Sequence, residues 1–237
     1  MRLLISCRQR PSPRWPADTG AKRANKIDAV VVGSGPNGLA AAIQLAQAGK
    51  SVTVLEAEDS IGGGARSGEL TRPGFVHDIC SAIHPLAAGS SFFRSLPLQR
   101  YGLELIQPPL PLAHPLDEAT VELRRSLDET AAGLGVDGPA YRRLMSPLVR
   151  NADFLMRQFF APLRIMPSTA LHGPLLARFG LMAIRSAVGF ARSTFKQAPA
   201  RALIAGMAAH SIQPLTNLST AGYGMMLGVS GHAYGWP

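Results

Sequence analysis

The residues best suited to chemistry are six consecutive positions that follow a short apolar run. Ala29 to Val32 leads directly into Gly33-Ser34-Gly35-Pro36-Asn37-Gly38. We expect Gly33 to allow a tight turn, Gly35 to let a pyrophosphate reach the backbone, and Gly38 to allow close helix packing. A helix starting at Pro36 would direct its free amides and positive dipole end at the phosphates. The spacing predicts that residues 33–38 contact a dinucleotide.

An acidic residue completes this pattern. A second apolar run, Val52 to Leu55, ends on Glu56, which lies 23 residues after Gly33. A carboxylate at that place accepts hydrogen bonds from the hydroxyls of an adenosine ribose, and it would repel a 2′-phosphate. We therefore expect Glu56 and its neighbour Ala57 to contact the ribose, and we do not expect NADP at this site.

The surrounding elements give the motif its specificity. A lone G-x-G-x-x-G is weak in a chain with 24 glycines, and a purely structural glycine turn is the alternative. Here a strand, a glycine turn, an alanine-rich helix, a second strand and an acid follow one another at the required lengths. Val30 to Val32 is typical of a strand buried on both faces of a parallel sheet. The sequence predicts an α/β fold with a Rossmann-like domain.

The segment after Glu56 indicates which dinucleotide binds. In Ile61-Gly62-Gly63-Gly64-Ala65-Arg66-Ser67 the chain resembles flavoprotein oxidoreductases of the glutathione-reductase-like FAD class. More narrowly, it resembles the phytoene dehydrogenase (carotenoid desaturase) branch, as does the turn and strand over residues 72–78. In that class a glycine pair follows the ribose-binding glutamate, and a nearby arginine reaches the FAD phosphates.

The resemblance implies FAD as the cofactor, with Gly62 and Gly63 as the glycine pair and Arg66 as the phosphate-binding arginine. Many members place the arginine directly after the pair, whereas here it comes three positions after Gly63. A flexible surface loop is the alternative interpretation of the glycine triplet.

The same resemblance implies an activity. It is hydride transfer from C–H bonds of a hydrophobic, polyene- or lipid-like small molecule to the flavin, with the protein binding and orienting both partners. A flavin amine oxidase and a flavin-dependent double-bond isomerase are rival enzymes on a similar fold. A truncated, non-catalytic nucleotide-binding fragment is the rival from another class, because family members are roughly twice as long as these 237 residues.

The chain divides into three parts. Residues 1–26 are basic and rich in proline and are expected to be disordered. Residues 27–85 form the incomplete FAD-binding Rossmann-like unit, and residues 86–237 form a partial substrate domain of mixed strands and helices. In this last part we expect strands at residues 103–106 and 120–123, and helices at about 127–133, 139–161 and 174–195.

Side chains outside the glycine unit offer little catalysis. The two cysteines, Cys7 and Cys80, form no C-x-x-C pair, which excludes disulfide reduction, and Cys80 is expected to be a small buried residue. His77 and His84 precede the region where the family's chain approaches the flavin, so either could move a proton or be simply structural. No histidine spacing fits a metal site, and no catalytic residue is assigned.

Charge is spread unevenly over the chain. The net charge of +9 divides into +6 over residues 1–26, −4 over residues 27–153 and +7 over residues 154–237, where no acid occurs. On a single helix over residues 174–195, Arg178, Arg185 and Arg192 would share one face, which fits either a peripheral contact with an anionic membrane or an ordinary solvated face. We expect no nucleic-acid binding, because no aromatic residues interleave with these arginines. The oligomeric state is open.

The expected location follows from the same segments. Nothing in the chain indicates secretion, since the apolar run Leu3–Ile5 is too short for a signal-peptide core. We expect a cytoplasmic protein, membrane-peripheral if the arginine face binds lipid, and mitochondrial if residues 1–26 are a transit peptide.

Overall fold

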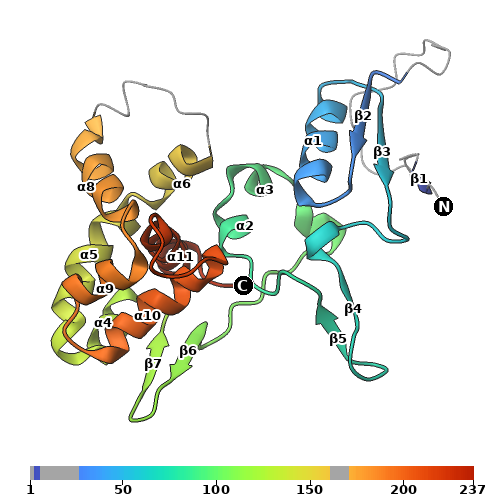
Figure 1. The fold of residues 1–237 in the computed structure, drawn as a ribbon. Helices are drawn as coiled ribbons and strands as arrows, with labels where there is room; N and C mark the ends of the chain where they lie inside the picture. The colour runs from blue at the N-terminus through green and yellow to red at the C-terminus, as the bar shows by residue number, and fades with distance from the viewer. Residues whose placement is uncertain (1–2, 6–26, 161–170) are drawn as a thin grey trace. The chain divides into compact units, whose positions relative to one another are not determined.

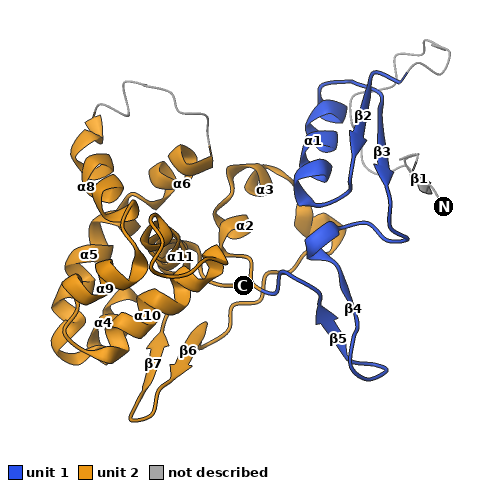
Figure 2. Ribbon diagram, viewed as in Figure 1, with its two compact units in different colours: residues 1–82 blue, residues 83–237 orange. Residues whose placement is uncertain are grey.

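The computed structural model describes residues 3–5, 27–160 and 171–237, and for residues 3–5 it describes the backbone alone. The chain divides into two compact units, Met1–Ala82 and Ile83–Pro237 (Figure 2). The first contains a small sheet with one helix, and the second is mainly helical with one hairpin. The expected α/β fold class is confirmed.

The first unit is built on a β-α-β arrangement (Figure 1). Strand β2 (Ala29–Val32) runs parallel to β3 (Val52–Glu56), with Val30 opposite Thr53 and Val32 opposite Leu55. Helix α1 (Pro36–Gln47) connects the two strands and packs against both. Pro36 stands at the start of the helix, where its missing N–H costs no helical hydrogen bond.

One face of this sheet is open to solvent. Val31 points toward α1, with its Cγ1 atom 3.6 Å from the place a side-chain Cβ would occupy at Gly38. Val30 and Val32 point to the opposite face, where 54% and 82% of their surfaces are exposed. The prediction of a strand buried on both faces is wrong, because strand side chains alternate and α1 covers only one face.

A third strand lies on the other edge of β3. Strand β1 (Leu3–Ile5) pairs with it in antiparallel fashion, with Leu4 opposite Leu55. At these three residues the structure has a strand where the sequence predicted disorder, because the free edge of β3 offers backbone donors and acceptors for pairing. The rest of the predicted disordered segment, with Cys7, lies outside the described residues.

The unit ends in a short turn of 3-10 helix and a hairpin. The turn η1 (Gly63–Ala65) is followed by β4 (Ser67–Glu69), which pairs in antiparallel fashion with β5 (Val76–Asp78). Cys80 follows β5 and is a free, exposed thiol. Its predicted burial is wrong, because every residue from 71 to 80 is exposed.

The second unit has one hairpin, which the sequence predicted in part. Strand β7 (Thr120–Leu123) is confirmed, but it pairs with β6 (Leu112–Pro115), not with a strand at residues 103–106. Residues 103–106 form no regular structure, and Ile106 is 73% exposed. The prolines around β6 concealed this strand, although proline is tolerated at the end of an edge strand.

The other regular elements among the described residues of this unit are helices. In chain order they are α2 (Pro85–Gly89), α3 (Ser91–Ser95), η2 (Leu98–Tyr101), α4 (Leu127–Gly133), η3 (Gly135–Asp137), α5 (Gly138–Arg150), α6 (Ala152–Phe160), α8 (Gly173–Ala183), α9 (Ala187–Thr194), α10 (Ala198–Ala208), η4 (Ala209–Ser211) and α11 (Thr220–Tyr234). The start of α4 is confirmed, since the Glu129 amide donates a 3.2 Å hydrogen bond to the Ser126 hydroxyl.

Both long predicted helices are interrupted. The first breaks at Asn151, between α5 and α6, and not at Pro147, which lies inside α5. There the Asn151 side-chain amide donates to the Pro147 carbonyl over 2.8 Å. The predicted end near Ala161 lies outside the described residues.

The second long helix is replaced by α8 and α9, which meet at an angle of 111°. Ser186 starts α9 by accepting a 3.1 Å hydrogen bond from the Gly189 amide. The prediction that Arg178, Arg185 and Arg192 share one helix face is therefore wrong. Among the described residues no single helix is long and apolar enough to cross a membrane, although α8 and α9 meet those criteria as a bent pair.

Helix α11 forms the centre of the second unit's core. Its glycines allow close contact with neighbouring helices: a Cβ at Gly224 would lie 2.9 Å from the Ile204 carbonyl oxygen, and one at Gly228 would lie 2.9 Å from the Met145 methyl carbon. Met225 and Val229 are fully buried. Most of α11 is therefore packed core.

A buried polar pair crosses this core. The Tyr141 hydroxyl lies 2.8 Å from His232 Nε2, and His232 Nδ1 lies 3.0 Å from the Arg125 carbonyl oxygen. Because a carbonyl can only accept, Nδ1 carries the proton and Nε2 accepts from Tyr141. Burial lowers the pKa of His232 below its usual 6.5, so the imidazole is neutral in the folded chain.

We expect Tyr141→Phe to lower the free energy of unfolding by about 1–3 kcal/mol, because it leaves His232 Nε2 buried without a partner. The native chain should also lose stability as the pH falls below about 6.5, since the unfolded histidine takes up a proton more readily than the folded one. Urea unfolding between neutral pH and pH 5 measures both effects. Equal midpoints for the native and variant chains would contradict the assignment.

Candidate dinucleotide-binding site

The glycine turn has the backbone that its sequence predicted. Gly33 has a φ of +92°, which favours glycine, and its amide donates a 2.7 Å hydrogen bond to the Leu55 carbonyl. A Cβ at Gly38 would overlap the Gly33 carbonyl oxygen. Both glycines are therefore required by the fold, and they hold the end of β2 against the start of α1.

The N-terminus of α1 offers free amides. Leu39 is the first residue of this turn to bond back, donating to the Gly35 carbonyl over 2.9 Å. The amides of Asn37 and Gly38 consequently have no partner inside the helix, and they lie at its positive end. The Asn37 side chain is exposed. This geometry suits an anionic group such as a diphosphate.

Glu56 lies against the same turn. One oxygen of its carboxylate, Oε2, accepts from the Ser34 hydroxyl and from the Ser34 amide, the latter over 2.8 Å. The other oxygen, Oε1, accepts from the amides of Ala57 and Glu58 over 2.9 and 3.1 Å. The Ser34 bonds, followed by that of Glu58, lower the pKa of Glu56 from 4.5 to about 2. The carboxylate is therefore ionised at neutral pH.

The predicted glycine pair also meets the turn. The Gly62 amide donates to the Ser34 carbonyl over 3.0 Å. A Cβ at Gly63 would come within 2.9 Å of Gly35 Cα. These contacts require glycine at position 63, and they close the loop of residues 62–65 over the turn.

Arg66 directly follows this loop. Its Nε donates to the Gly63 carbonyl over 3.0 Å, and its Nη1 lies 3.8 Å from Glu58 Oε2. The guanidinium is thus held beside the glycine loop while keeping free N–H groups. Arg66 stands two positions later than a residue directly after the glycine pair would, and it still contacts the glycine loop.

Sequence reasoning missed two contributions to this site. The Ser34 side chain is fully buried and donates a hydrogen bond to Glu56. The Glu58 amide also donates to Glu56, and the Glu58 carboxylate lies 3.8 Å from the Arg66 guanidinium. A serine between the two glycines and a second acid two residues after Glu56 were visible signals. Ser34 belongs to the predicted contact residues 33–38, but spacing alone does not predict the bond of its side chain to Glu56, and Glu58 lies outside the motif.

The arrangement fits the ADP portion of a dinucleotide. An ionised carboxylate has about four acceptor sites, and four donors already occupy those of Glu56. Three of these are backbone amides, whereas the Ser34 hydroxyl can rotate away. A ribose hydroxyl would therefore replace the Ser34 hydroxyl, and the diphosphate would lie over Gly35 and the free α1 amides. The cofactor roles of residues 33–38, 56–57, 62–63 and 66 stay a prediction.

The two candidate proton carriers lie in different units. His77 lies on β5, exposed, with Nε2 2.8 Å from the Thr71 hydroxyl, while His84 belongs to the second unit and its amide donates to the Pro237 carbonyl over 2.9 Å. Within the described residues, no group of three or more histidine, cysteine or acidic side chains could hold a metal ion.

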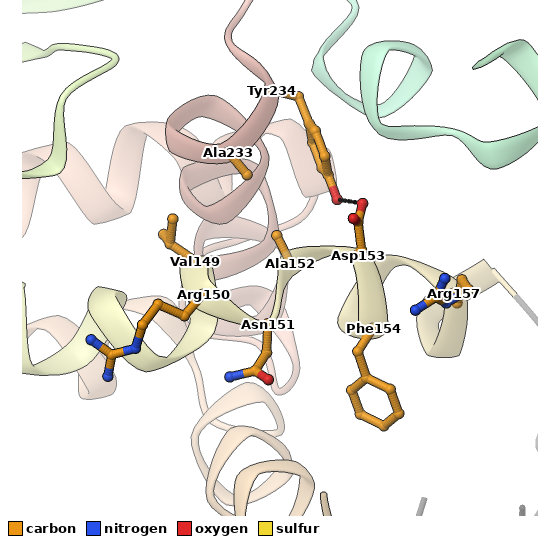
Figure 3. A pocket seen from close by; sticks show the side chains of 9 residues that line it. All are labelled: Val149, Arg150, Asn151, Ala152, Asp153, Phe154, Arg157, Ala233 and Tyr234. Carbon is orange, nitrogen blue, oxygen red and sulfur yellow. Dashed lines mark hydrogen bonds between the residues drawn. The ribbon is translucent and has the colours of Figure 1, made fainter. Parts of the chain in front are cut away.

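The second unit has an open cavity of about 410 Å³ between α5, α6 and the end of α11 (Figure 3). On its edge the Tyr234 hydroxyl donates to Asp153 Oδ1 over 2.8 Å, and Arg94 Nη2 donates to the same oxygen over 3.1 Å. Burial raises the pKa of Tyr234, and the hydrogen bonds from Tyr234 and Arg94 lower the pKa of Asp153. This network joins α3, α6 and α11, and it keeps the phenol protonated.

Comparison with known proteins agrees with the geometry of the first unit. Residues 31–96 match the family described as the NAD(P)-binding Rossmann-like domain. This match covers the end of β2, the glycine turn, α1, β3 and the glycine loop. The chain therefore contains a Rossmann-like dinucleotide-binding domain, consistent with FAD or NAD(P).

Longer proteins share more of the chain. Pyridine nucleotide-disulfide oxidoreductase domain-containing protein 2 of Mus musculus is 34% identical over 154 residues, which cover 63% of this chain and 25% of that protein. The Rattus norvegicus protein of the same name is 29% identical over 208 residues, 80% of this chain and 35% of that protein. The chain thus spans a quarter to about a third of the length of these relatives.

A local match and a solved structure complete the comparison. A soluble pyridine nucleotide transhydrogenase of Vibrio vulnificus strain YJ016 is 54% identical over 41 residues, 17% of this chain and 9% of that protein. A triple mutant of putrescine oxidase superposes with a TM-score of 0.50 at 23% identity, covering 87% of this chain and 43% of that one. The latter is a similarity of fold.

Proposed function

We propose that this chain is part of an FAD-dependent oxidoreductase and that its first unit binds the ADP portion of FAD. The proposal rests on two contacts: Ser34 donates hydrogen bonds to Glu56, and the backbones of Gly35 and Gly63 pack closely together. They unite a ribose acceptor, free helix amides and a cation, Arg66, around one backbone surface. The named relatives, all oxidoreductases or transhydrogenases by description, support the same class.

FAD is favoured over NAD by the second glycine segment. A glycine pair after the ribose-binding glutamate, with an arginine nearby, is the pattern of the FAD-binding flavoproteins that the chain resembles, whereas the diphosphate itself is common to FAD and NAD. NADP is disfavoured, because the ionised Glu56 would repel a 2′-phosphate.

We propose a hydrophobic small molecule as the substrate, with oxidation at a C–H bond, as in the phytoene dehydrogenases that the chain resembles. FAD supplies the hydride acceptor when it is bound. The chain's own residues then bind and orient it: Glu56 fixes the ribose, the α1 amides and Arg66 hold the diphosphate, and Gly35 allows close approach. Disulfide reduction is not proposed, because Cys7 and Cys80 form no redox pair in the sequence.

The purified chain should show the absorbance bands of bound flavin, or acquire them when FAD is added. Anaerobic mixing with a polyene should then bleach those bands, whereas an alkylamine should not. Bleaching by the amine alone would favour an amine oxidase. A folded chain that retains no FAD would overturn the cofactor assignment, and retention without bleaching by any substrate would leave a nucleotide-binding module without this activity.

A further inference from the structure

One edge of the second unit exposes several large apolar side chains together. Leu181 and Ile184 lie one helical turn apart at the end of α8, and 69% and 58% of their surfaces are exposed. The loop of residues 212–218 adds Ile212 and Leu218, which are 93% and 77% exposed. We call these four residues, with Tyr223 at the start of α11, the apolar edge.

Backbone hydrogen bonds hold this loop against the bend between α8 and α9. The Ser219 amide donates to the Ile184 carbonyl over 3.0 Å, and the Ala221 amide donates to that of Arg185 over 3.2 Å. A further bond joins the Val188 amide to the Leu215 carbonyl over 3.2 Å. Leu218 is therefore fixed beside Ile184, and the edge is an ordered surface.

The inner faces of the same helices are already used. Phe190 and Ala191 of α9 are buried, and Leu175, Phe179 and Met182 of α8 pack against the core. Only the outer side chains remain available to a partner. This supports contact with a surface and argues against insertion of the helices themselves.

Ile212 has an unusual backbone. Its φ is +54°, in the left-handed region that β-branched residues rarely adopt. A strained conformation that projects a large apolar side chain into water favours neither stability nor solubility, so it points toward a use in binding.

Charge identifies the partner. Residues 154–237 contain no acid and seven basic residues, and Arg178, Arg185 and Arg192 lie on or beside α8 and α9. Within the described ranges, no carboxylate pairs with any of these three. Arg178 donates a hydrogen bond to the Arg143 carbonyl, and Arg185 donates to the Gly189 carbonyl and the Ser193 hydroxyl. These partners are uncharged, so the positive charge is not neutralised. Apolar side chains beside such arginines suit an anionic bilayer surface.

We propose that the apolar edge docks the chain on membranes with anionic phospholipid headgroups. Leu181, Ile184, Ile212 and Leu218 enter the boundary between headgroups and acyl chains, while the arginines bind the headgroups. The proposal is independent of FAD, so it can be tested on the chain without cofactor.

The test is co-sedimentation of the full chain with phosphatidylcholine vesicles, with or without phosphatidylglycerol. We expect binding to the anionic vesicles only, and weaker binding as salt rises. Ile212→Asn should weaken it about tenfold by removing apolar contact, while raising thermal stability, because asparagine tolerates a positive φ. Arg192→Gln should weaken it about fivefold.

Matched controls lie elsewhere in the second unit. Val136 is 61% exposed and Arg125 is exposed, so Val136→Asn and Arg125→Gln should leave vesicle binding unchanged. Equal binding by all variants, or by neutral vesicles, would overturn the proposal. A dimer that Ile212→Asn converts to a monomer, with no vesicle binding, would overturn it in favour of a contact between copies of this chain.

Discussion

Replacing Gly35 with alanine is expected to weaken FAD binding by about tenfold to a hundredfold, because the added methyl group would stand where the diphosphate approaches the backbone. In the chain alone that methyl group has room. Its nearest neighbour, Gly63 Cα, would be 3.9 Å away, and the backbone at Gly35 is extended, with φ −66° and ψ 173°. The free energy of unfolding should change by less than about 1 kcal/mol.

Substitutions at two other glycines serve as controls for this prediction. At Gly38 a methyl group would overlap the Gly33 carbonyl, so Gly38→Ala should lower stability by about 3 kcal/mol or more and lose binding with it. At Gly68 the nearest atom would be 3.9 Å away in the Leu70 side chain, so Gly68→Ala should change neither property. Calorimetric titration with FAD and urea unfolding measure all three. Full affinity in Gly35→Ala would show that no phosphate lies over this residue.

The second large effect is expected at Glu56. Glu56→Gln replaces one acceptor oxygen by a donor and removes the charge, so it opposes the Ser34 amide and binds the ribose poorly. We expect FAD affinity to fall by at least about tenfold, as for lost hydrogen bonds to a charged group. Glu69→Gln, the same change at an exposed position on β4, should leave the affinity within about threefold.

Acid-induced unfolding is a second test of the role of Glu56. Since the pKa of Glu56 falls from 4.5 to about 2 on folding, its contribution to stability is complete above pH 4.5 and is lost as the pH falls toward 2. Glu56→Gln should show a smaller loss over that window. An unchanged acid-unfolding curve would mean that the Ser34–Glu56 bonds do not form.

The first unit could be predicted from sequence because its determinants are local. Gly33, Gly38 and Pro36 act within one turn, and Glu56 follows its strand directly, so spacing alone placed them correctly. The exposure of Val30 and Val32 could not be predicted in the same way. A run of valines indicates a strand, but what covers each face depends on elements elsewhere in the chain.

The second unit shows how periodicity can mislead. Arg178, Arg185 and Arg192 repeat every seven residues, yet the helix ends at Ala183, and Ser186 starts another at a different angle. Ser186 is a typical N-cap residue, but no other signal around it indicated a break in the helix. Strand β6 was missed for the opposite reason, since prolines at residues 111 and 115 lowered its local propensity and only pairing with β7 reveals it.

The most direct test of the central claim is to titrate the purified chain with FAD, ADP and FMN. If the first unit binds only the ADP portion of FAD, as proposed, FAD and ADP should bind and compete with each other, whereas FMN should not bind. Binding of FMN without ADP, or FAD that ADP cannot displace, would contradict the account, as would a folded chain that binds none of the three.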